Sequence, residues 1–189
     1  MNNPWLVYQA KAFYNAFIAL EQISDPVDDP MLLLIPRIVN GAFAAEITLK
    51  AILTEQGINY DKGHNLKVLF DKLPQNIQKE FWEFLCSKKP EYTDVEKREK
   101  ELMIMSDAFI KWRYCFEGNN PPAFDINFLS AFANAAIYMM FDLGYNAYLQ
   151  PATLSESVED IEKKYENNRN TNYQNSTNYI NRKQNGGTA

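Results

Sequence analysis

The stretch Ala42–Leu73, AFAAEITLKAILTEQGINYDKGHNLKVLFDKL, places two helical patterns on either side of a Gly-His-Asn-Leu turn. Apolar residues recur at intervals of three and four on both sides, which is the period of a helix with one buried face. His64, the only histidine of the chain, lies in the turn between them. The stretch therefore predicts two helices joined by a turn that carries a titratable side chain.

Outward from this stretch, apolar spacing predicts helices along most of the chain. Pro4 suits the first turn of the first helix, and Gly57 suits the position just past the end of the second. The last helix is apolar nearly all round, which places it centrally in a bundle, and no convincing strand pattern occurs. The expected helices cover about residues 4–23, 30–56, 66–73, 75–87, 93–117 and 125–150. The sequence thus predicts an all-α fold, an up-and-down bundle of four to six helices.

The C-terminal part of the chain changes in composition after Pro151. Residues 159–166 are compatible with a short helix. Residues 167–189 are rich in Asn and carry too few apolar residues to offset the entropy of ordering. We therefore divide the chain into a helical bundle at residues 1–154 and a flexible low-complexity tail at residues 155–189, with a short helix followed by a disordered segment.

The composition indicates a soluble, cytoplasmic protein. A chain of 189 residues with 46% hydrophobic residues can bury a core without disulfides. Cys86 and Cys115 are each flanked by aromatic residues, which favours buried, reduced thiols. No signal-peptide pattern begins the sequence, and its apolar run at residues 31–35 is closed by Pro36 and is too short to span a membrane.

The net charge of −5 argues against strong, sequence-independent binding of nucleic acid. Such binding needs a basic stripe that releases counterions from the phosphate backbone. The densest charged run, EKREKE at residues 96–101, alternates both signs and is typical of the solvated face of a helix. The acidic body of the chain therefore repels phosphate backbones.

Several catalytic chemistries lack the residues they need. A zinc site needs clustered Cys and His, and this chain has one His and two distant Cys. Neither a GxSxG elbow nor a phosphate-cradling glycine loop occurs, and a serine or cysteine hydrolase would have to take its base from His64. We therefore expect no metal and no cofactor.

Three segments carry a resemblance to a known family. They are AAEITLKAIL at residues 44–53, GHNLKVLF at residues 63–70 and WRYCFEG at residues 112–118. In this order and spacing they resemble the HEPN superfamily of small helical bundles, and the similarity covers residues 4–150. The resemblance implies a homodimer that binds RNA or nucleotides and often serves as a toxin or defence effector. It also implies protein partners such as a nucleotidyltransferase or an antitoxin.

The chain departs from the nuclease members of that family after Arg113. Those members carry an arginine followed four to six residues later by a histidine, and the two side chains organise metal-independent attack by an RNA 2′-hydroxyl on its own phosphate. Here the residues after Arg113 read YCFEGNNPP, with no histidine. Asn119 can form hydrogen bonds there but cannot shuttle a proton near pH 7. We therefore expect the usual ribonuclease activity to be absent.

The candidate site residues also have structural interpretations. His64 would cap a helix or bond a backbone carbonyl, with Gly63 supplying unusual backbone angles. Glu46 would pair with Lys50, four residues on, or with Arg113 across the bundle.

Glu117, four residues after Arg113, offers that arginine a second acidic partner. An ion-pair network near the helix ends is therefore an alternative to a ligand site.

Two functions remain open. The first is a non-catalytic, dimeric binding and assembly module that recognises RNA, a nucleotide or a protein partner in a defence or toxin–antitoxin type system. The second is a divergent, metal-independent ribonuclease that uses Arg113 with His64 or Asn119. No residue is assigned a catalytic role, and the candidate ligand-binding residues are Glu46, Lys50, His64, Arg113, Glu117 and Asn119.

Overall fold

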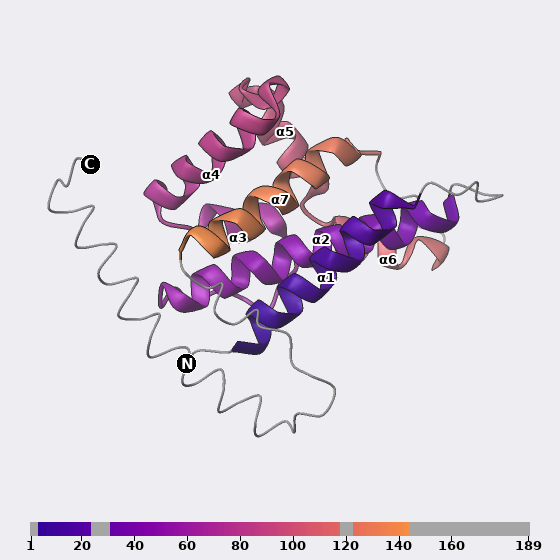
Figure 1. The fold of residues 1–189 in the computed structure, drawn as a ribbon, viewed down its shortest axis with the longest axis horizontal. Coiled ribbons are helices and arrows are strands. Elements are labelled where there is room, and N and C mark those ends of the chain that lie inside the picture. The colour runs from indigo at the N-terminus through magenta and orange to yellow at the C-terminus, as the bar shows by residue number, and fades with distance from the viewer. Residues whose placement is uncertain (1–3, 24–30, 118–122, 144–189) are drawn as a thin grey trace, which may run out of the picture. The chain divides into compact units, whose positions relative to one another are not determined.

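The computed structural model describes residues 4–23, 31–117 and 123–143, and the regular elements in these ranges are all helical (Figure 1). The all-α prediction is confirmed. The chain divides into two compact units, Met1–Met139 and Met140–Ala189, and the packing described below is that of the first. The predicted tail at residues 155–189, the boundary before it and Asn119 lie outside the described residues.

The first two helices, α1 (Pro4–Gln22) and α2 (Met31–Glu55), pack against each other, and Figure 1 shows them side by side. The two come very close at Gly41 of α2, where a Cβ atom would lie 2.9 Å from Cδ2 of Phe17 in α1. Phe17 has no exposed surface. A side chain at Gly41 would therefore force the Phe17 ring or the helix that carries it to move.

The C-terminal end of α2 is closed by a left-handed glycine. Gly57 has a φ of 68°, its N–H donates to the carbonyl of Thr54, and the N–H of Ile58 donates to the carbonyl of Leu53. This pair of bonds is the Schellman motif, which satisfies the last carbonyls of a helix. The prediction that Gly57 follows the end of the second helix is confirmed, and the chain then returns toward α2.

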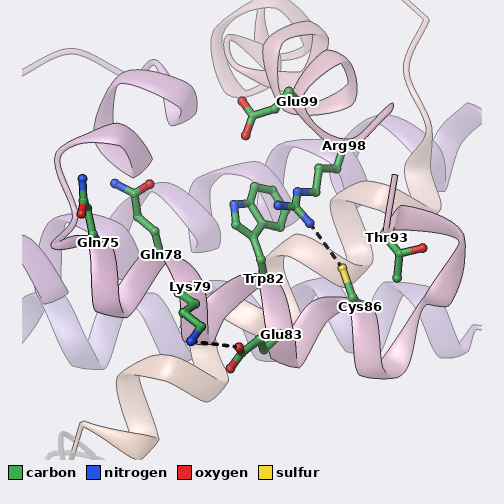
Figure 2. A pocket seen from close by; sticks show the side chains of 9 residues that line it. All are labelled: Gln75, Gln78, Lys79, Trp82, Glu83, Cys86, Thr93, Arg98 and Glu99. Carbon is green, nitrogen blue, oxygen red and sulfur yellow. Dashed lines mark hydrogen bonds and ion pairs between the residues drawn. The ribbon is translucent and has the colours of Figure 1, made fainter. Parts of the chain in front are cut away.

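The next helices are α3 (Leu66–Asp71) and α4 (Gln75–Lys88), which are separated at Pro74. A 3-10 turn, η1 (Pro90–Tyr92), leads to α5 (Val95–Met105). The Asp94 carboxylate caps α5 by accepting from the N–H groups of Glu96 and Lys97. A cavity of about 540 Å³ lies between α4 and the beginning of α5 (Figure 2).

The prediction of one continuous helix over residues 93–117 is wrong. The segment forms α5, then α6 (Ala108–Arg113), then a 3-10 turn, η2 (Cys115–Glu117). The break at Ser106 frees its carbonyl to accept from the N–H of Leu66 at 2.9 Å, while its Oγ accepts from the N–H of Lys67. The break therefore supplies partners for the first turn of α3, whose N–H groups have none within the helix. The described residues accordingly hold seven α-helices, one more than the sequence predicted.

The helix α7 (Ile126–Asp142) occupies the core, as its apolar sequence predicted. Phe128 and Phe132 have no exposed surface. The Phe132 ring centroid lies 4.8 Å from that of Phe81 in α4 and 5.8 Å from that of Phe70 in α3. Edge-to-face and tilted ring pairs at these separations stabilise a core beyond simple burial.

The two cysteines are free thiols. Cys86 and Cys115 are each partly buried, which is less enclosed than the sequence predicted. The Cys86 thiol donates to the carbonyl of Tyr92 at 3.3 Å.

One described helix, Leu32–Glu55, is long and apolar enough to span a membrane by length and composition alone. The sequence expectation concerned uninterrupted apolar runs, and it is not contradicted, because this helix contains Arg37, Glu46 and Lys50. Half of the apolar window is buried inside the structure, where the helix packs against α1 and α6. Core helices of soluble proteins pass the same test, and this burial is that of a core helix.

Candidate functional site

A buried carboxylate on α2 organises the candidate site. Glu46 is 1% exposed, and its Oε1 accepts a hydrogen bond from Lys50 Nζ at 2.7 Å and lies 2.9 Å from His64 Nδ1. Its Oε2 is buried without a hydrogen-bond partner among the residues described. A buried carboxylate needs donors or cations to offset its lost hydration, and Lys50 and His64 supply them to one of the two oxygens.

His64 is oriented by this carboxylate while its side chain stays 43% exposed. With Nδ1 donating to Glu46, the neutral ring carries its acceptor lone pair on Nε2. The ring centroid lies 5.4 Å from that of Phe109 in α6. An imidazole fixed through one nitrogen and accessible to solvent is suited to hydrogen bonding with a ligand.

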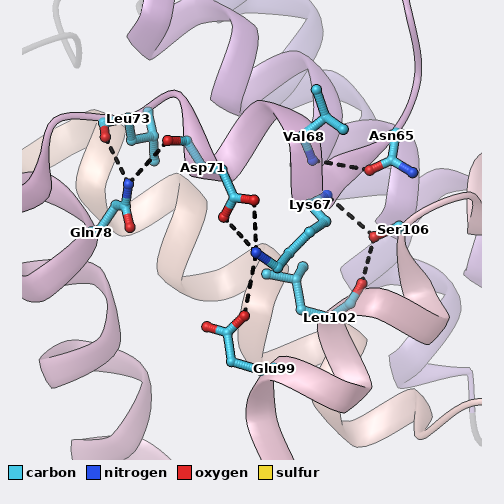
Figure 3. A network of polar contacts seen from close by, with 9 residues as sticks. All are labelled: Asn65, Lys67, Val68, Asp71, Leu73, Gln78, Glu99, Leu102 and Ser106. Carbon is cyan, nitrogen blue, oxygen red and sulfur yellow. Dashed lines mark hydrogen bonds and ion pairs between the residues drawn. The ribbon is translucent and has the colours of Figure 1, made fainter. Parts of the chain in front are cut away.

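The expectation that His64 caps a helix is wrong, because its neighbour Asn65 does so. Asn65 Oδ1 accepts from the N–H of Val68 at 2.9 Å (Figure 3). Its Nδ2 donates to Asp107 Oδ1 at 2.9 Å, which ties the turn to the break between α5 and α6. Asparagine before a helical run is a common cap, and this signal is present in the sequence. The cap leaves the His64 side chain to contact Glu46.

A lysine network holds α3 on the side that faces α5. Lys67 Nζ lies 2.6 and 2.7 Å from the two carboxylate oxygens of Asp71 and 3.4 Å from Glu99 Oε2 (Figure 3). The hydrogen bond to Asp71 raises the pKa of Lys67 above its usual value, against the opposing effect of burial. The network adds to the Asn65 cap in fixing α3, and with it the turn that precedes α3.

Arg113 is the last residue of α6 and is exposed. Its guanidinium carbon lies 5.5 Å from the Phe109 ring centroid and 5.3 Å from the Tyr114 ring centroid. It forms no salt bridge with any residue in the described ranges. Its charge is therefore balanced there only by the faces of two aromatic rings.

The two ion pairs predicted for Arg113 do not form. Glu46 pairs with Lys50 instead, as the alternative prediction proposed. Glu117 does not reach the arginine, because α6 ends at Arg113 and η2 begins at Cys115, so the i to i+4 geometry of a continuous helix is lost.

Phe109 joins the two halves of the site. The His64 ring centroid lies 5.4 Å from the Phe109 ring centroid, and the Arg113 guanidinium carbon lies 5.5 Å from it, so both side chains contact the same ring. Phe109 in turn stacks on Phe43 of α2, with centroids 4.4 Å apart and ring planes 14° apart. We name these side chains the α2–α6 cluster: Phe43, Glu46, Lys50, His64, Phe109 and Arg113.

Aromatic members of the site escaped sequence analysis. Phe43 and Phe109 follow helical spacing, which indicates core as readily as a binding surface. Tyr60 was also missed, and its ring centroid lies 6.0 Å from Lys50 Nζ while its hydroxyl lies 3.1 Å from Thr54 Oγ1. No periodic signal marks Tyr60, because it lies in the loop after α2.

The charges of the α2–α6 cluster leave a local positive excess in an acidic chain. Lys50 balances Glu46, whereas Arg113 has no described acidic neighbour, and protonation of His64 would add to the excess. In the ranges that the structure covers, no three potential ligands come together to hold a metal ion. The arrangement is therefore suited to an anion, with the guanidinium as a donor and the imidazole as a second polar contact.

Two further predictions concern the loop residues. Gly63 does not have a positive φ, so the expectation of unusual backbone angles there is wrong, and Gly57 has that role at the end of α2. Asn119 lies outside the described residues, so its predicted contribution stays a prediction.

Comparison with known proteins finds a similarity to a protein family in this region. The HEPN domain family model matches residues 39–120. The matched range holds every member of the α2–α6 cluster. No curated protein and no solved structure matches the chain.

Proposed function

From the HEPN domain at residues 39–120, we propose that the protein is a non-catalytic binding and assembly module that recognises a phosphate group of RNA or of a nucleotide at the α2–α6 cluster. HEPN domains include both ribonuclease toxins and nucleotide-binding modules. Within that range, the chain retains an arginine for phosphate but lacks a histidine in the nine residues after it. Binding without cleavage fits this residue set best.

The observation that carries the proposal is the unpaired charge of Arg113 beside His64. A guanidinium without an acidic partner keeps its donors for a ligand, and charge-assisted hydrogen bonds to phosphate are among the strongest that a side chain forms. Both side chains lie against the Phe109 ring. The cluster therefore offers a preformed contact for one or two phosphates.

A site of this size predicts a weak dependence of affinity on salt. Each phosphate that a protein neutralises on a single strand contributes a slope of about −0.7 to the plot of log affinity against log salt concentration. With one or two phosphates, we expect a slope of about −1, which is shallow compared with proteins that use a basic stripe.

The direct test is an anisotropy titration of a fluorescent single-stranded RNA with the full chain. We expect Arg113→Gln to weaken binding about tenfold or more, because it removes a charge-assisted contact. Lys111→Gln is the matched control, since Lys111 carries the same charge two residues earlier but pairs with Asp107 at 3.2 Å. Equal losses in the two variants, or no binding by the wild type, would overturn the proposal.

A divergent ribonuclease is the second candidate, and the Glu46–His64 contact favours it. A carboxylate that orients an imidazole is a recurrent arrangement for a general base. The test is incubation of RNA with the protein in EDTA, followed by analysis of the product ends. Cleavage that both Arg113→Ala and His64→Gln abolish would replace the binding proposal with the enzymatic one, whereas cleavage that persists in both variants would come from a contaminant.

We also propose that the protein acts as a cytoplasmic homodimer, within a defence or toxin–antitoxin type system that supplies a partner such as a nucleotidyltransferase or an antitoxin. Support for self-association comes from the family match, and the exposed apolar side chain of Leu32 on α2 is a position at which an interface can be probed. Light scattering of the wild type and of Leu32→Asp measures this directly. A monomer at all concentrations would contradict the dimer without affecting the phosphate site.

A further inference from the structure

A second concave site lies away from the α2–α6 cluster and shares no residue with it. One face of α4, from Gln75 to Cys86, lies opposite Thr93 and the first turns of α5, and together they line the cavity of about 540 Å³, which is open to solvent (Figure 2). Pockets that hold small molecules typically span about 300–1,000 Å³. The proposed phosphate site does not use this cavity.

Arg98 occupies the middle of the cavity wall. Its guanidinium carbon lies 4.7 Å from the ring centroid of Trp82, and Nη1 lies 3.9 Å from Cys86 Sγ (Figure 2). Its Nε is buried without a hydrogen-bond partner. Contact with a largely buried indole restricts the guanidinium plane, which reduces the entropy that a ligand would have to remove on binding.

The acidic residues that line the same cavity do not neutralise Arg98. Glu83 Oε1 lies 3.7 Å from Lys79 Nζ, and Glu99 Oε2 lies 3.4 Å from Lys67 Nζ. No carboxylate in the described ranges, including these two, lies within ion-pair distance of Arg98. Arg98 is therefore the cation of this lining that has no ion-pair partner among the described residues.

Neutral hydrogen-bonding groups lie at both ends of the cavity. Figure 2 shows Gln75 and Gln78 at one end, Thr93 at the other, and Trp82 with Arg98 between them. Gln78 Nε2 already donates to the carbonyl of Leu73 at 2.8 Å, so its amide oxygen remains as an acceptor. A ligand that fills the cavity can thus be held by its polar ends as well as by its charge.

We propose that this cavity binds a small molecule that carries a single carboxylate, with Arg98 as the anchoring residue. A guanidinium presents paired donors that match the two oxygens of a carboxylate. The single unpaired cation matches a monoanion, whereas the second charge of a phosphate dianion would meet no unpaired cation among the lining residues. An apolar part of the ligand packs against Trp82, the aromatic residue of the lining.

The test is a titration of the ¹⁵N-labelled full chain, observed through the indole N–H signals of its three tryptophans. The probes are benzoate, its neutral counterpart benzamide, and phenyl phosphate. We expect benzoate to shift the Trp82 signal saturably in the millimolar range, and benzamide and phenyl phosphate to bind about tenfold more weakly. Trp82→Phe identifies the signal by its disappearance.

Variants at Arg98 separate the charge from the planar donor pair. Arg98→Gln should weaken the affinity for benzoate about tenfold or more, and Arg98→Lys should weaken it by a smaller factor. Lys88→Gln removes the same charge from α4 outside the cavity and should bind as the wild type does. If Arg98→Gln does not fold, Arg98→Lys alone decides, because a wild-type affinity there excludes recognition by the planar donor pair.

Three results would overturn the proposal. They are the absence of a saturable shift with benzoate, equal affinity for benzoate and benzamide, and an affinity for phenyl phosphate that equals or exceeds that for benzoate. The last result would identify a phosphate site instead.

Discussion

Two carboxylates in this protein are held in opposite ways. Asp125, just before α7, has both oxygens occupied: Oδ2 accepts from the Tyr92 hydroxyl at 2.8 Å and Oδ1 accepts from the N–H of Asn127 at 2.9 Å. Glu46 has two donors on Oε1 and none on the buried Oε2. The first carboxylate joins η1 to the beginning of α7, and the second lies under an exposed histidine.

The two carboxylates therefore have different roles: Asp125 stabilises the fold, whereas Glu46 belongs to the candidate site. At Asp125, burial would raise the pKa of the carboxyl group, but the hydrogen bonds from Tyr92 and from the backbone N–H groups outweigh it, and the pKa lies below its usual value. Such a site stabilises the ionised state and needs no ligand. At Glu46 the hydrogen bonding is incomplete, and Arg113, which lies against the same Phe109 ring as His64, has no acidic partner among the described residues, so its donors are left for a ligand.

The largest expected effect is at Glu46. Glu46→Leu leaves Lys50 without its partner, and because the Lys50 side chain is 13% exposed we expect a loss of about 2–3 kcal/mol in the free energy of unfolding, below the range for fully buried pairs. Glu46→Leu combined with Lys50→Leu should recover most of that loss. Urea unfolding of the three proteins measures both. A stable single variant would mean that the Glu46–Lys50 pair contributes nothing to the fold.

The next effect is at Tyr92. Tyr92→Phe removes a hydrogen bond to a charged group and should cost about 2 kcal/mol at pH 7. The folded pKa of Asp125 is lowered from an unfolded value of about 3.9, so this stabilisation is fully present above that value and is lost as the pH falls through the folded pKa.

The difference in the free energy of unfolding between the wild type and Tyr92→Phe should therefore become smaller as the pH is lowered below about 4. Unfolding measured at pH 7 and at successively lower pH checks the sign. A difference that grows in acid would contradict the assignment of Asp125 as the ionised partner.

Asn65 comes third, because it caps α3 after the His64 turn and also bonds Asp107 at the break between α5 and α6. Asn65→Ala removes the cap of α3 and should cost about 1 kcal/mol. Asn65→Ser keeps a capping oxygen while losing the bond to Asp107, so its stability should lie between those of the wild type and the alanine variant. Thermal unfolding ranks the three, and equal stability of Ala and Ser would show that the cap is not what holds this turn.

The smallest expected effect on stability is at Arg113. Arg113→Gln leaves no buried partner unpaired and loses only an exposed contact with two rings, so the free energy of unfolding should change by about 0.5 kcal/mol. Chemical denaturation measures it alongside the RNA titration. A loss comparable to that of Glu46→Leu would assign Arg113 to the architecture and remove the reason to call it a binding residue.

Most helices could be predicted from local pattern. Residues 4–22, 31–55 and 75–88 were found because their apolar period, their prolines and Gly57 agree with one another. The break at Ser106 was missed, because Leu102, Met105 and Phe109 keep their spacing across it. Its cause is the need of α3 for acceptors, which lies about 40 residues away in the sequence and leaves no local signal.

The candidate site was predictable as a set of residue types but not as a geometry. The i to i+4 spacing of Glu46 and Lys50 predicts their pair, and this is confirmed. The contact between Glu46 and His64 depends on how the loop after α2 folds back, which no periodicity encodes. The convergence of His64 and Arg113 on Phe109 likewise required the helix break that the sequence concealed.

The most direct measurement of the central claim follows the single histidine. Because His64 is the only histidine of the chain, its imidazole Cε1–H signal needs no further assignment in a ¹³C-labelled sample. On addition of a short single-stranded RNA, we predict a saturable shift of this signal that Lys111→Gln retains and Arg113→Gln loses. RNA binding that leaves the His64 signal unmoved, or a shift that survives in Arg113→Gln, would contradict the account.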